Sequence, residues 1–409
     1  MRILMIANYL PYPLLSGGRL RIYHLLRRVA DRHEVTLAAL LESPDDREGI
    51  AHLRQFCHRV ETAELDGRGR WRKAPGMLRY ALEGHPPDLR LLHSESLARR
   101  IGRLAASERF DVVQMESVMG LYLRALPPGR SSKTILMFQN VGAAQFARIT
   151  RIERSRYRKV RSWINGVSMQ HWEPRYAERF DRCTTVSEAD QALLRRANPR
   201  LRVDVIPNGV DTEAYQPLPE RAPMAAPSLL FIGNMSYPPC VDAVVTFCEE
   251  ILPLVRRAIP AVKLRIVGAD PQAAVKALAG NGVEVTGRVE DVVAYYRESA
   301  ASIVPLRAGG GTRLKILEAM ALGRPVVSTT IGCEGLNVVD GEHLLIADQP
   351  DRFAEATIRV LQDAGLRDAL CTNARRLVEA QYGWNQIAGR LEEVYQSLFE
   401  DRGAVGAIR

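Results

Sequence analysis

The sequence contains no apolar stretch close to the roughly 18 residues that a helix needs to cross a bilayer. Its six cysteines include no C-x-x-C pair and no zinc-ligand spacing, so we interpret them as reduced thiols of a cytoplasmic protein. Lysine is scarce, and the net charge of +9 therefore comes almost entirely from arginine. A basic surplus favours an anionic partner, such as nucleic acid, lipid headgroups or phosphorylated metabolites. The charge alone does not indicate which of these is bound.

The chain has 409 residues, of which 46% are hydrophobic and 25% are charged. This composition is that of an ordinary globular protein, and the length predicts two or three domains. The N-terminal run begins like a signal peptide, but Asn8, Pro11 and Pro13 interrupt it and no small-residue cleavage site follows. We therefore predict a first β-strand there and not a targeting segment.

Short apolar runs alternate with longer amphipathic runs along most of the chain, which favours parallel sheets whose strands are joined by helices. The predicted strands are Arg2–Ala7, Glu34–Leu40, Val60–Glu64, Asp111–Met115, Thr134–Phe138, Cys183–Val186, Val203–Ile206, Leu229–Ile232, Lys263–Val267, Val283–Thr286, Ala301–Val304, Pro325–Ser328 and Leu344–Ile346. The predicted helices include Gly18–Ala30, Val241–Ala258, Asp291–Ser299 and Leu314–Leu322, and the chain after Asp351 is predicted to be helical throughout.

Prolines crowd the stretch AYQPLPERAPMAAP, which has no periodicity and is predicted to be a linker. We place an N-terminal domain at residues 1–215, the linker at 216–227, a second domain at 228–381 and a last helical segment at 382–409. The predicted fold class is α/β, with two Rossmann-like domains in tandem. Because open parallel sheets bind ligands beyond the carboxyl ends of their strands, we expect a ligand in a cleft between the two domains.

The stretch PLRAGGGTRLKILEAMALGRPVV places three glycines between a predicted strand and a predicted helix. Gly309–Gly311 allow backbone N–H groups to approach a ligand, and the helix start adds uncapped N–H groups. Arg313 and Lys315 stand in the first helical turn, where the helix dipole prefers anions. A bound anion such as diphosphate would offset both charges, and the alternative is a flexible loop with solvated cations.

Two further sites have weaker signals. Glu318 lies one to two turns into the same helix, where its carboxylate is either a surface group or an acceptor for two vicinal hydroxyls such as those of a ribose. The loop that contains Gly17 and Gly18 also joins a strand to a helix, and it is either a phosphate or sugar site or a plain turn. The stretch that contains Gly309–Gly311 is not a Walker A loop, because its Gly-to-Lys spacing is wrong.

The run ARITRIERSRYRKVR has seven cations and one carboxylate. Arg151, Arg154, Arg158 and Arg161 recur at helical spacing, and we predict that they share one helix face. Such a face is either solvated or suited to anionic lipid and a lipid-linked acceptor. Nucleic-acid binding fits less well, because no recognised module is present.

Seven segments resemble, in order, those of one enzyme family: PLLSGGRLR, FDRCTTVSEADQALL, VDVIPNGVDTEAYQP, LLFIGNMSYPPCVDAV, LRIVGAD, VEVTGRVEDV and GGGTRLKILEAMALGRPVVSTTIGCEGL. The chain resembles the retaining glycosyltransferases of the group 1, or family 4, class, which have the GT-B fold. The resemblance covers nearly the whole chain and is strongest over residues 183–347. It is closest to bacterial transferases from exopolysaccharide gene clusters.

The resemblance implies a nucleotide-sugar donor on the C-terminal domain and an acceptor mainly on the N-terminal domain. It also implies that the last helix packs back on the N-terminal domain and that no metal or other cofactor is required. Glu318 matches the ribose-binding glutamate of the family. The other residues that we assign to the donor are Gly17, Gly18, Gly233, Asn234, Gly309, Gly310, Gly311, Thr312 and Leu314.

The sequence departs from the family pattern at three places. Gly310 stands where most members have a first glutamate that touches the donor sugar. Asn234 and Pro239 lie where many members have an arginine and a lysine that neutralise diphosphate. Glu116 and Gln139 lie where a histidine is common.

We hypothesise that Arg313 and Lys315 are the catalytic cations that replace the missing pair. The expected activity is the transfer of a sugar from a nucleotide-sugar to a glycan or lipid-linked acceptor, in bacterial surface polysaccharide synthesis. The expected location is the cytoplasm, with a peripheral contact at the inner face of the cell membrane left open. The alternative is a catalytically impaired sugar-nucleotide-binding regulator or assembly partner, and the local motifs give no support to a GT-B epimerase.

Overall fold

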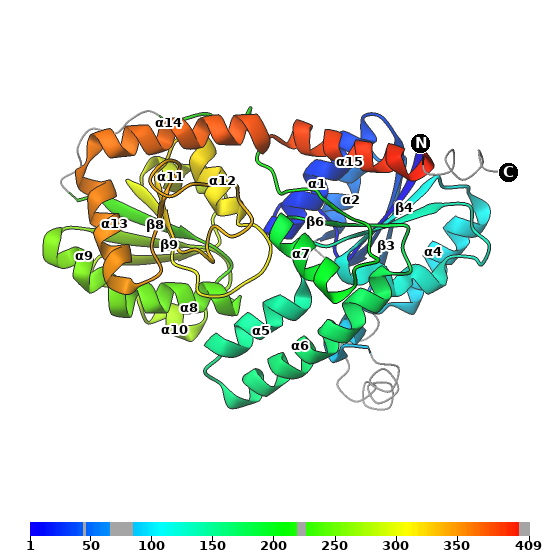
Figure 1. Ribbon diagram of the computed structural model, residues 1–409, viewed down its shortest axis with the longest axis horizontal. Coiled ribbons are helices and arrows are strands. Elements are labelled where there is room, and N and C mark those ends of the chain that lie inside the picture. The colour runs from blue at the N-terminus through cyan, green and yellow to red at the C-terminus, as the bar shows by residue number, and fades with distance from the viewer. Residues whose placement is uncertain (44–45, 66–84, 219–225, 401–409) are drawn as a thin grey trace. The chain divides into compact units, whose positions relative to one another are not determined.

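The computed structural model describes residues 1–43, 46–65, 85–218 and 226–400 of the chain. The chain divides into two compact units, which are distinguished in Figure 1 by the two groups of strands. The first unit comprises Met1–Ala147, Val160–Pro207 and the chain from Asn385 onward, and the second comprises Arg148–Lys159 and Asn208–Trp384. Residues 208–215, which were predicted to belong to the first domain, are therefore part of the second unit. Within the predicted linker, residues 219–225 lie outside the described residues.

The first unit contains a seven-stranded sheet in which all neighbouring strands are parallel, in the order β3-β2-β1-β4-β5-β6-β7. Its strands are β1 Arg2–Ala7, β2 Glu34–Leu41, β3 Arg59–Glu64, β4 Val112–Glu116, β5 Lys133–Met137, β6 Arg182–Thr185 and β7 Val203–Val205. The central strands β1, β4 and β5 are buried along almost their whole length, as expected where helices cover both faces of a parallel sheet. They are mostly apolar, although β4 includes Gln114 and Glu116.

The helices that accompany these strands lie in the first unit, apart from residues 148–159 and Trp384, which belong to the second. They are α1 Gly17–Ala30, α2 Asp46–Leu53, η1 Pro87–Leu92, α4 Glu95–Ser107, η2 Ser117–Ala125, α5 Gly142–Ile152, α6 Arg156–Ala177, α7 Glu188–Ala197 and α15 Trp384–Glu400. Side-chain caps start several of them: the Ser16 hydroxyl accepts the Arg19 N–H at α1, and the Glu173 carboxylate accepts the Gly142 N–H at α5 at 2.7 Å.

The second unit contains a six-stranded parallel sheet in the order β10-β9-β8-β11-β12-β13. Its strands are β8 Ser228–Ile232, β9 Lys263–Val267, β10 Val283–Gly287, β11 Ala301–Val304, β12 Val326–Ser328 and β13 Leu345–Ile346. Its helices are α8 Pro238–Thr246, η3 Phe247–Ile251, α9 Leu252–Ala258, α10 Ala273–Lys276, α11 Val292–Arg297, α12 Leu314–Ala321, α13 Pro350–Gln362 and α14 Ala364–Gln381. Both units therefore have the Rossmann-like arrangement that the alternating pattern predicted.

All thirteen predicted strands are present, and each bound agrees with the structure to within one residue. The predicted helix Val241–Ala258 is instead two α-helices with a π-helical turn, η3, between them. Pro253 explains the interruption, because it lacks the N–H that a continuous α-helix would direct at the carbonyl of Glu249.

The prediction that four arginines of the basic run share one helix face is wrong. Helix α5 ends at Ile152 and α6 begins at Arg156, so Arg151 is on α5 and Arg154 lies in the connection. At the break, the Glu153 carboxylate accepts the Ser155 N–H at 2.9 Å, and that N–H is therefore not directed at the preceding turn.

The C-terminal helix α15 is bonded to other elements of the first unit. Tyr395 donates a hydrogen bond to the Gln114 side chain of β4, and Arg32 pairs with Glu392 at 2.5 Å. Tyr395 is fully buried. Within the described residues, no helix combines the length and apolarity that crossing a bilayer requires.

Candidate functional site

The glycine loop, residues 309–311, joins β11 to α12 at the carboxyl end of the second sheet. Gly309 and Gly311 have positive φ angles of 130° and 66°, which glycine adopts without the strain that a Cβ would add. The Oγ1 of Thr312 is buried without a hydrogen-bond partner, while the Thr312 carbonyl accepts the Asn208 amide at 3.3 Å. The predicted donor residues of this segment are therefore brought together in one tight turn.

The Arg313 side chain folds back on the glycine loop. Its Nη1 donates hydrogen bonds to the carbonyls of Gly310 and Gly311, and the whole residue is buried. Burial lowers its pKa from the ordinary arginine value. In this structure the guanidinium holds the loop, so its catalytic role remains a prediction.

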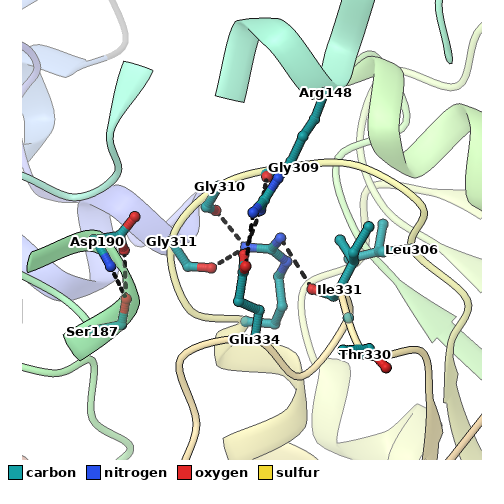
Figure 2. Close-up of polar contacts among 12 residues, drawn as sticks. Arg148, Ser187, Asp190, Leu306, Gly309, Gly310, Gly311, Thr330, Ile331 and Glu334 are labelled. Atoms are coloured by element: carbon teal, nitrogen blue, oxygen red, sulfur yellow. Dashed lines mark hydrogen bonds and ion pairs between the residues drawn. The ribbon is translucent and has the colours of Figure 1, made fainter. Parts of the chain in front are cut away.

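A second arginine supports the same loop from outside the predicted site. Arg148 donates to the Gly309 carbonyl at 3.0 Å and forms a two-pronged ion pair with Glu334, as Figure 2 shows. Both residues are half-buried, and this geometry is the strong form of an arginine–carboxylate interaction. Sequence reasoning missed this pair, because the two residues lie 186 positions apart and no local pattern links them.

Lys315 places its amino group at the end of β8. Its Nζ is buried, lies 4.1 Å from the centre of the Phe231 ring and has no hydrogen-bond partner among the described residues. A Cβ on Gly233 would lie 3.0 Å from this nitrogen, so the predicted donor glycine leaves the space that the amine occupies. Burial is the main reason that the pKa of Lys315 is lowered.

Glu318 lies one turn further along α12, and Tyr296 of α11 fixes its position. The Tyr296 hydroxyl is 3.0 Å from the Lys315 carbonyl and 3.4 Å from Glu318 Oε2, and it can donate to either. Burial raises the pKa of Glu318, and the nearby Lys315 charge opposes that rise. No sequence motif pointed to Tyr296, which is a fully buried residue of an apolar helix.

The three glycines that end β8, β9 and β10 make the floor of this site. A Cβ on Gly268 would be 1.6 Å from the Gly233 carbonyl oxygen, and Gly268 donates to the Gly287 carbonyl at 3.0 Å. Asn234, the remaining predicted donor residue here, uses its side-chain oxygen to accept the Ser236 N–H at 2.8 Å. Neighbouring backbone therefore leaves no room for a Cβ at Gly268, whereas a Cβ at Gly287 would meet nothing within 4 Å.

The carboxyl edge of the first sheet carries a separate polar chain. The Tyr9 hydroxyl donates to Gln139 at 3.3 Å, Gln139 donates to Glu116 at 3.3 Å, and Gln114 donates to Glu116 at 2.9 Å. Glu116 is buried, and its pKa is raised by that burial although the Arg21 charge opposes the rise.

The predicted loop of Gly17 and Gly18 meets this polar chain. Helix α1 begins at Gly17, and a Cβ on Gly18 would lie 1.8 Å from the Tyr9 hydroxyl oxygen. Gly18 is therefore required for Tyr9 to reach Gln139, which is a packing role that the turn signal alone did not indicate.

Metal binding and a separate surface hollow are not assigned to this site. Among the described residues, no group of three or more His, Cys, Asp or Glu side chains has a geometry that could hold a metal ion. A polar hollow of 280 Å³ lies beside Lys133 and Asp181. It is at the amino end of β5, whereas Glu116 and Gln139 lie at the opposite edge of the sheet, so the hollow is separate from them.

Replacing Arg313 with Ala is expected to lower turnover by more than about tenfold, which corresponds to about 1.4 kcal/mol in the barrier. The physical reason is that the carbonyls of Gly310 and Gly311 lose the donor that holds the loop in its tight turn. Steady-state kinetics measures the loss, and hydrogen exchange of the amides in residues 309–312 measures the loosening. A smaller loss of turnover would remove Arg313 from the catalytic assignment.

Two family models match the chain. The model described as "Glycosyltransferase Family 4" matches residues 15–214, and the model described as "Glycosyl transferases group 1" matches residues 226–363. Together they cover most of both structural units.

Individual proteins are similar over long stretches at low identity. An "Uncharacterized 44.6 kDa protein in cps region" of Klebsiella pneumoniae is 22% identical, over 98% of this chain and 99% of that protein. The "D-inositol 3-phosphate glycosyltransferase 1" of Catenulispora acidiphila is 26% identical, over 80% of this chain and 75% of that protein.

Solved structures share the fold of the chain. A sucrose-phosphate synthase from Thermosynechococcus elongatus has a TM-score of 0.74 and 18% identity, and the match covers 98% of this chain and all of that one. HepE from Anabaena, solved with UDP and glucose, has a TM-score of 0.66 and 16% identity over 97% of this chain and all of that one. At these identities the likeness is one of fold.

Proposed function

The chain belongs to the group 1, or family 4, glycosyltransferases and has the GT-B fold, and from this premise we propose its specific reaction. It transfers a hexose from a nucleoside-diphosphate sugar to a glycan or lipid-linked acceptor, with retention of the anomeric configuration. The acceptor belongs to the synthesis of a bacterial surface polysaccharide, on the cytoplasmic side of the cell membrane.

The single observation that carries the proposed donor site is the buried amine of Lys315. An ammonium group that is removed from water and left without a hydrogen bond is costly to the fold. A diphosphate at the end of β8 would give this group the partner that it lacks. The glycine at position 233 supports the proposal, because a Cβ there would lie 3.0 Å from the Lys315 amine and would crowd it.

The rest of the donor would be held by groups on the same unit. We assign the ribose hydroxyls to Glu318, whose carboxylate Tyr296 holds in place. We assign the phosphate oxygens to backbone N–H groups of the glycine loop and to the start of α12. The Oγ1 of Thr312, which is buried without a partner, would then bind a phosphate or sugar oxygen.

The proposed reaction requires stabilisation of charge more than a nucleophile. The bond between the anomeric carbon and the diphosphate oxygen breaks, and the acceptor oxygen bonds to that carbon on the same face of the sugar. The acceptor hydroxyl gives its proton to the departing phosphate oxygen. Lys315 and the loop N–H groups bind the negative charge that develops on diphosphate, which is the usual largest contribution to catalysis at such sites.

Names of the similar proteins support the biological setting. One is encoded in a cps region, and another acts on D-inositol 3-phosphate. A phosphatidyl-myo-inositol mannosyltransferase of Mycobacterium leprae is 28% identical over 47% of this chain and 53% of its own length. These names favour an anionic or lipid-linked acceptor in envelope synthesis.

A second candidate function is binding of a sugar nucleotide without transfer. Gly310 favours it, because the first glutamate of the family pattern is missing from the donor loop. Such a protein would act as a regulator or assembly partner, and it would bind the donor without consuming it.

Incubation with a panel of UDP-, GDP- and ADP-sugars and a polyprenyl-linked saccharide acceptor tests both candidates. We expect one donor to be consumed, with the product linkage keeping the anomeric configuration of the donor by NMR. We also expect activity to persist in EDTA, since the proposal assigns no step to a metal. Binding without transfer or hydrolysis would support the second candidate, and an inverted linkage would contradict the first.

A further inference from the structure

Helix α6 exposes an unusual number of large apolar side chains. Tyr157, Val160, Trp163, Ile164 and Val167, which we call the α6 stripe, are between 39% and 77% exposed, with Tyr157 and Trp163 at 77% and 60%. Half of the large apolar side chains that are exposed among the described residues lie on this one helix. A clustered set of this kind marks an interaction site more often than scattered exposed residues do.

The α6 stripe does not lie on the buried face of the helix. The helix buries Ser162, Asn165, Met169, Trp172 and Tyr176. At 3.6 residues per turn, the stripe covers an arc of roughly 120° on the opposite side. A helix that is apolar on both sides is usually buried on both sides, so the stripe lacks a partner in the described residues.

Cations lie within the arc of the stripe and at its edges, and the part of the helix that carries the stripe contains no carboxylate. At 3.6 residues per turn, Arg156 lies within the arc of the stripe and Lys159 and Arg161 lie at its two edges. All three are exposed, and between Arg156 and Trp172 the helix contains no Asp or Glu. Arg161 pairs with Asp88 at 2.8 Å, but no carboxylate of the described residues lies within ion-pair distance of Arg156 or Lys159. The surface around the stripe is therefore positively charged.

We propose that the α6 stripe docks on the surface of a bilayer that contains anionic phospholipid. The apolar side chains enter the boundary between headgroups and acyl chains, and the flanking cations bind the headgroup phosphates. Trp163 and Tyr157 suit this depth, because each has an apolar ring with one polar group. The arrangement lies parallel to the membrane and does not span it.

The charges favour lipid over a second copy of this chain. Two such faces brought together would oppose cations to cations, without carboxylates to pair them. The inference is independent of the donor site, which lies on other elements. Membrane binding and transferase activity in detergent can therefore fail separately, although docking would bring the enzyme to a lipid-linked acceptor.

Co-sedimentation of the full-length protein with vesicles tests the proposal. We expect binding to phosphatidylcholine vesicles that contain phosphatidylglycerol, weaker binding to phosphatidylcholine alone, and a reduction in high salt as the headgroup charges are screened. The double variant Trp163→Ser, Ile164→Ser is expected to lose at least about tenfold in partitioning, since two apolar side chains no longer leave water.

Matched variants separate the stripe from general effects. Val339→Ser removes a side chain that is 52% exposed on the second unit, and it is expected to leave vesicle binding unchanged. The charge-reversal variant Arg156→Glu, Lys159→Glu is expected to abolish the preference for anionic vesicles. Because the substituted side chains are exposed, the thermal midpoint is expected to stay at the wild-type value.

Three results would overturn the proposal. The first is no binding of the wild type to anionic vesicles at low salt. The second is equal binding by the wild type and the stripe variant. The third is a concentration-dependent dimer that the stripe variant abolishes while vesicle binding is absent, which would assign the stripe to a second copy of the chain.

Discussion

Lys315→Met is expected to lower kcat/KM for the nucleotide-sugar by about 10²- to 10³-fold, which is the usual loss when one preorganised donor to a developing negative charge is removed. The amine lies at the carboxyl end of the second sheet, and no hydrogen-bond partner within the described part of the chain explains its burial. Methionine is an unbranched side chain only one heavy atom shorter than lysine and can still pack near Phe231, so the main loss is the charged amine. The measurement is steady-state kinetics with the donor identified by the panel.

The stability of the same variant distinguishes a catalytic lysine from a structural one. Burial lowers the pKa of Lys315, so unfolding binds a proton at alkaline pH, between this lowered pKa and the ordinary lysine value. Stability contributed by this group therefore rises with pH in that window and is smallest below it. Lys315→Met is expected to remove this dependence and to leave the thermal midpoint at neutral pH equal or higher.

The control for Lys315 is Lys276→Met, which removes an exposed lysine of the same unit. We expect it to keep wild-type kinetics. A Lys315→Met enzyme with full activity, or one that loses activity only because it has unfolded, would contradict the donor-site assignment.

Gly268→Ala is expected to destabilise the second unit by about 3 kcal/mol or more, within the range of severe core mutations. A Cβ at this position would lie 1.6 Å from the Gly233 carbonyl oxygen, and both groups are backbone, so neither can rotate away. The φ angle of 154° adds strain for any residue with a side chain. Urea unfolding of the variant measures the effect, and a loss of donor affinity is expected with it, because Gly233 must shift.

Gly389→Ala is the matched control, since the same substitution is made in helix α15, where a Cβ meets nothing within 4 Å. Alanine in a helix interior is expected to be neutral or to stabilise by about 0.5–1 kcal/mol. If Gly268→Ala were as stable as this control, the close approach of β8 and β9 at the site would be wrong.

The sheets were predictable because their strands are short apolar runs between polar connections, and the thirteen strands agree with the predicted bounds. The break between α5 and α6 near Ser155 was not predictable. The cations on both sides have helical spacing, and only the Glu153 carboxylate shows where the helix stops. Helical periodicity describes where side chains point and does not report such a local hydrogen bond.

The candidate site was predictable where backbone chemistry decides it and not where distant side chains do. The glycine loop and Lys315 follow from residue types that few structural roles require. The inward turn of Arg313 and its neighbour Arg148 depend on carbonyls and on a carboxylate that are brought together only in the folded unit. Arg21 is another buried arginine that could not be placed from the sequence. It donates hydrogen bonds to the carbonyls of Ile206 and Pro207, which lie 185 and 186 positions away.

The polar chain at the first sheet has a consequence for the C-terminal end of the protein. Tyr395 donates a hydrogen bond to the side-chain oxygen of Gln114, which fixes the orientation of that amide. The amide nitrogen of Gln114 then donates to Glu116. Glu116 also accepts a hydrogen bond from the amide nitrogen of Gln139, which orients the amide oxygen of Gln139 to accept the Tyr9 hydroxyl. The last helical turns are thus part of the hydrogen-bonding environment of residues near the start of the chain, so shortening the protein before Tyr395 would disturb Tyr9 without touching it.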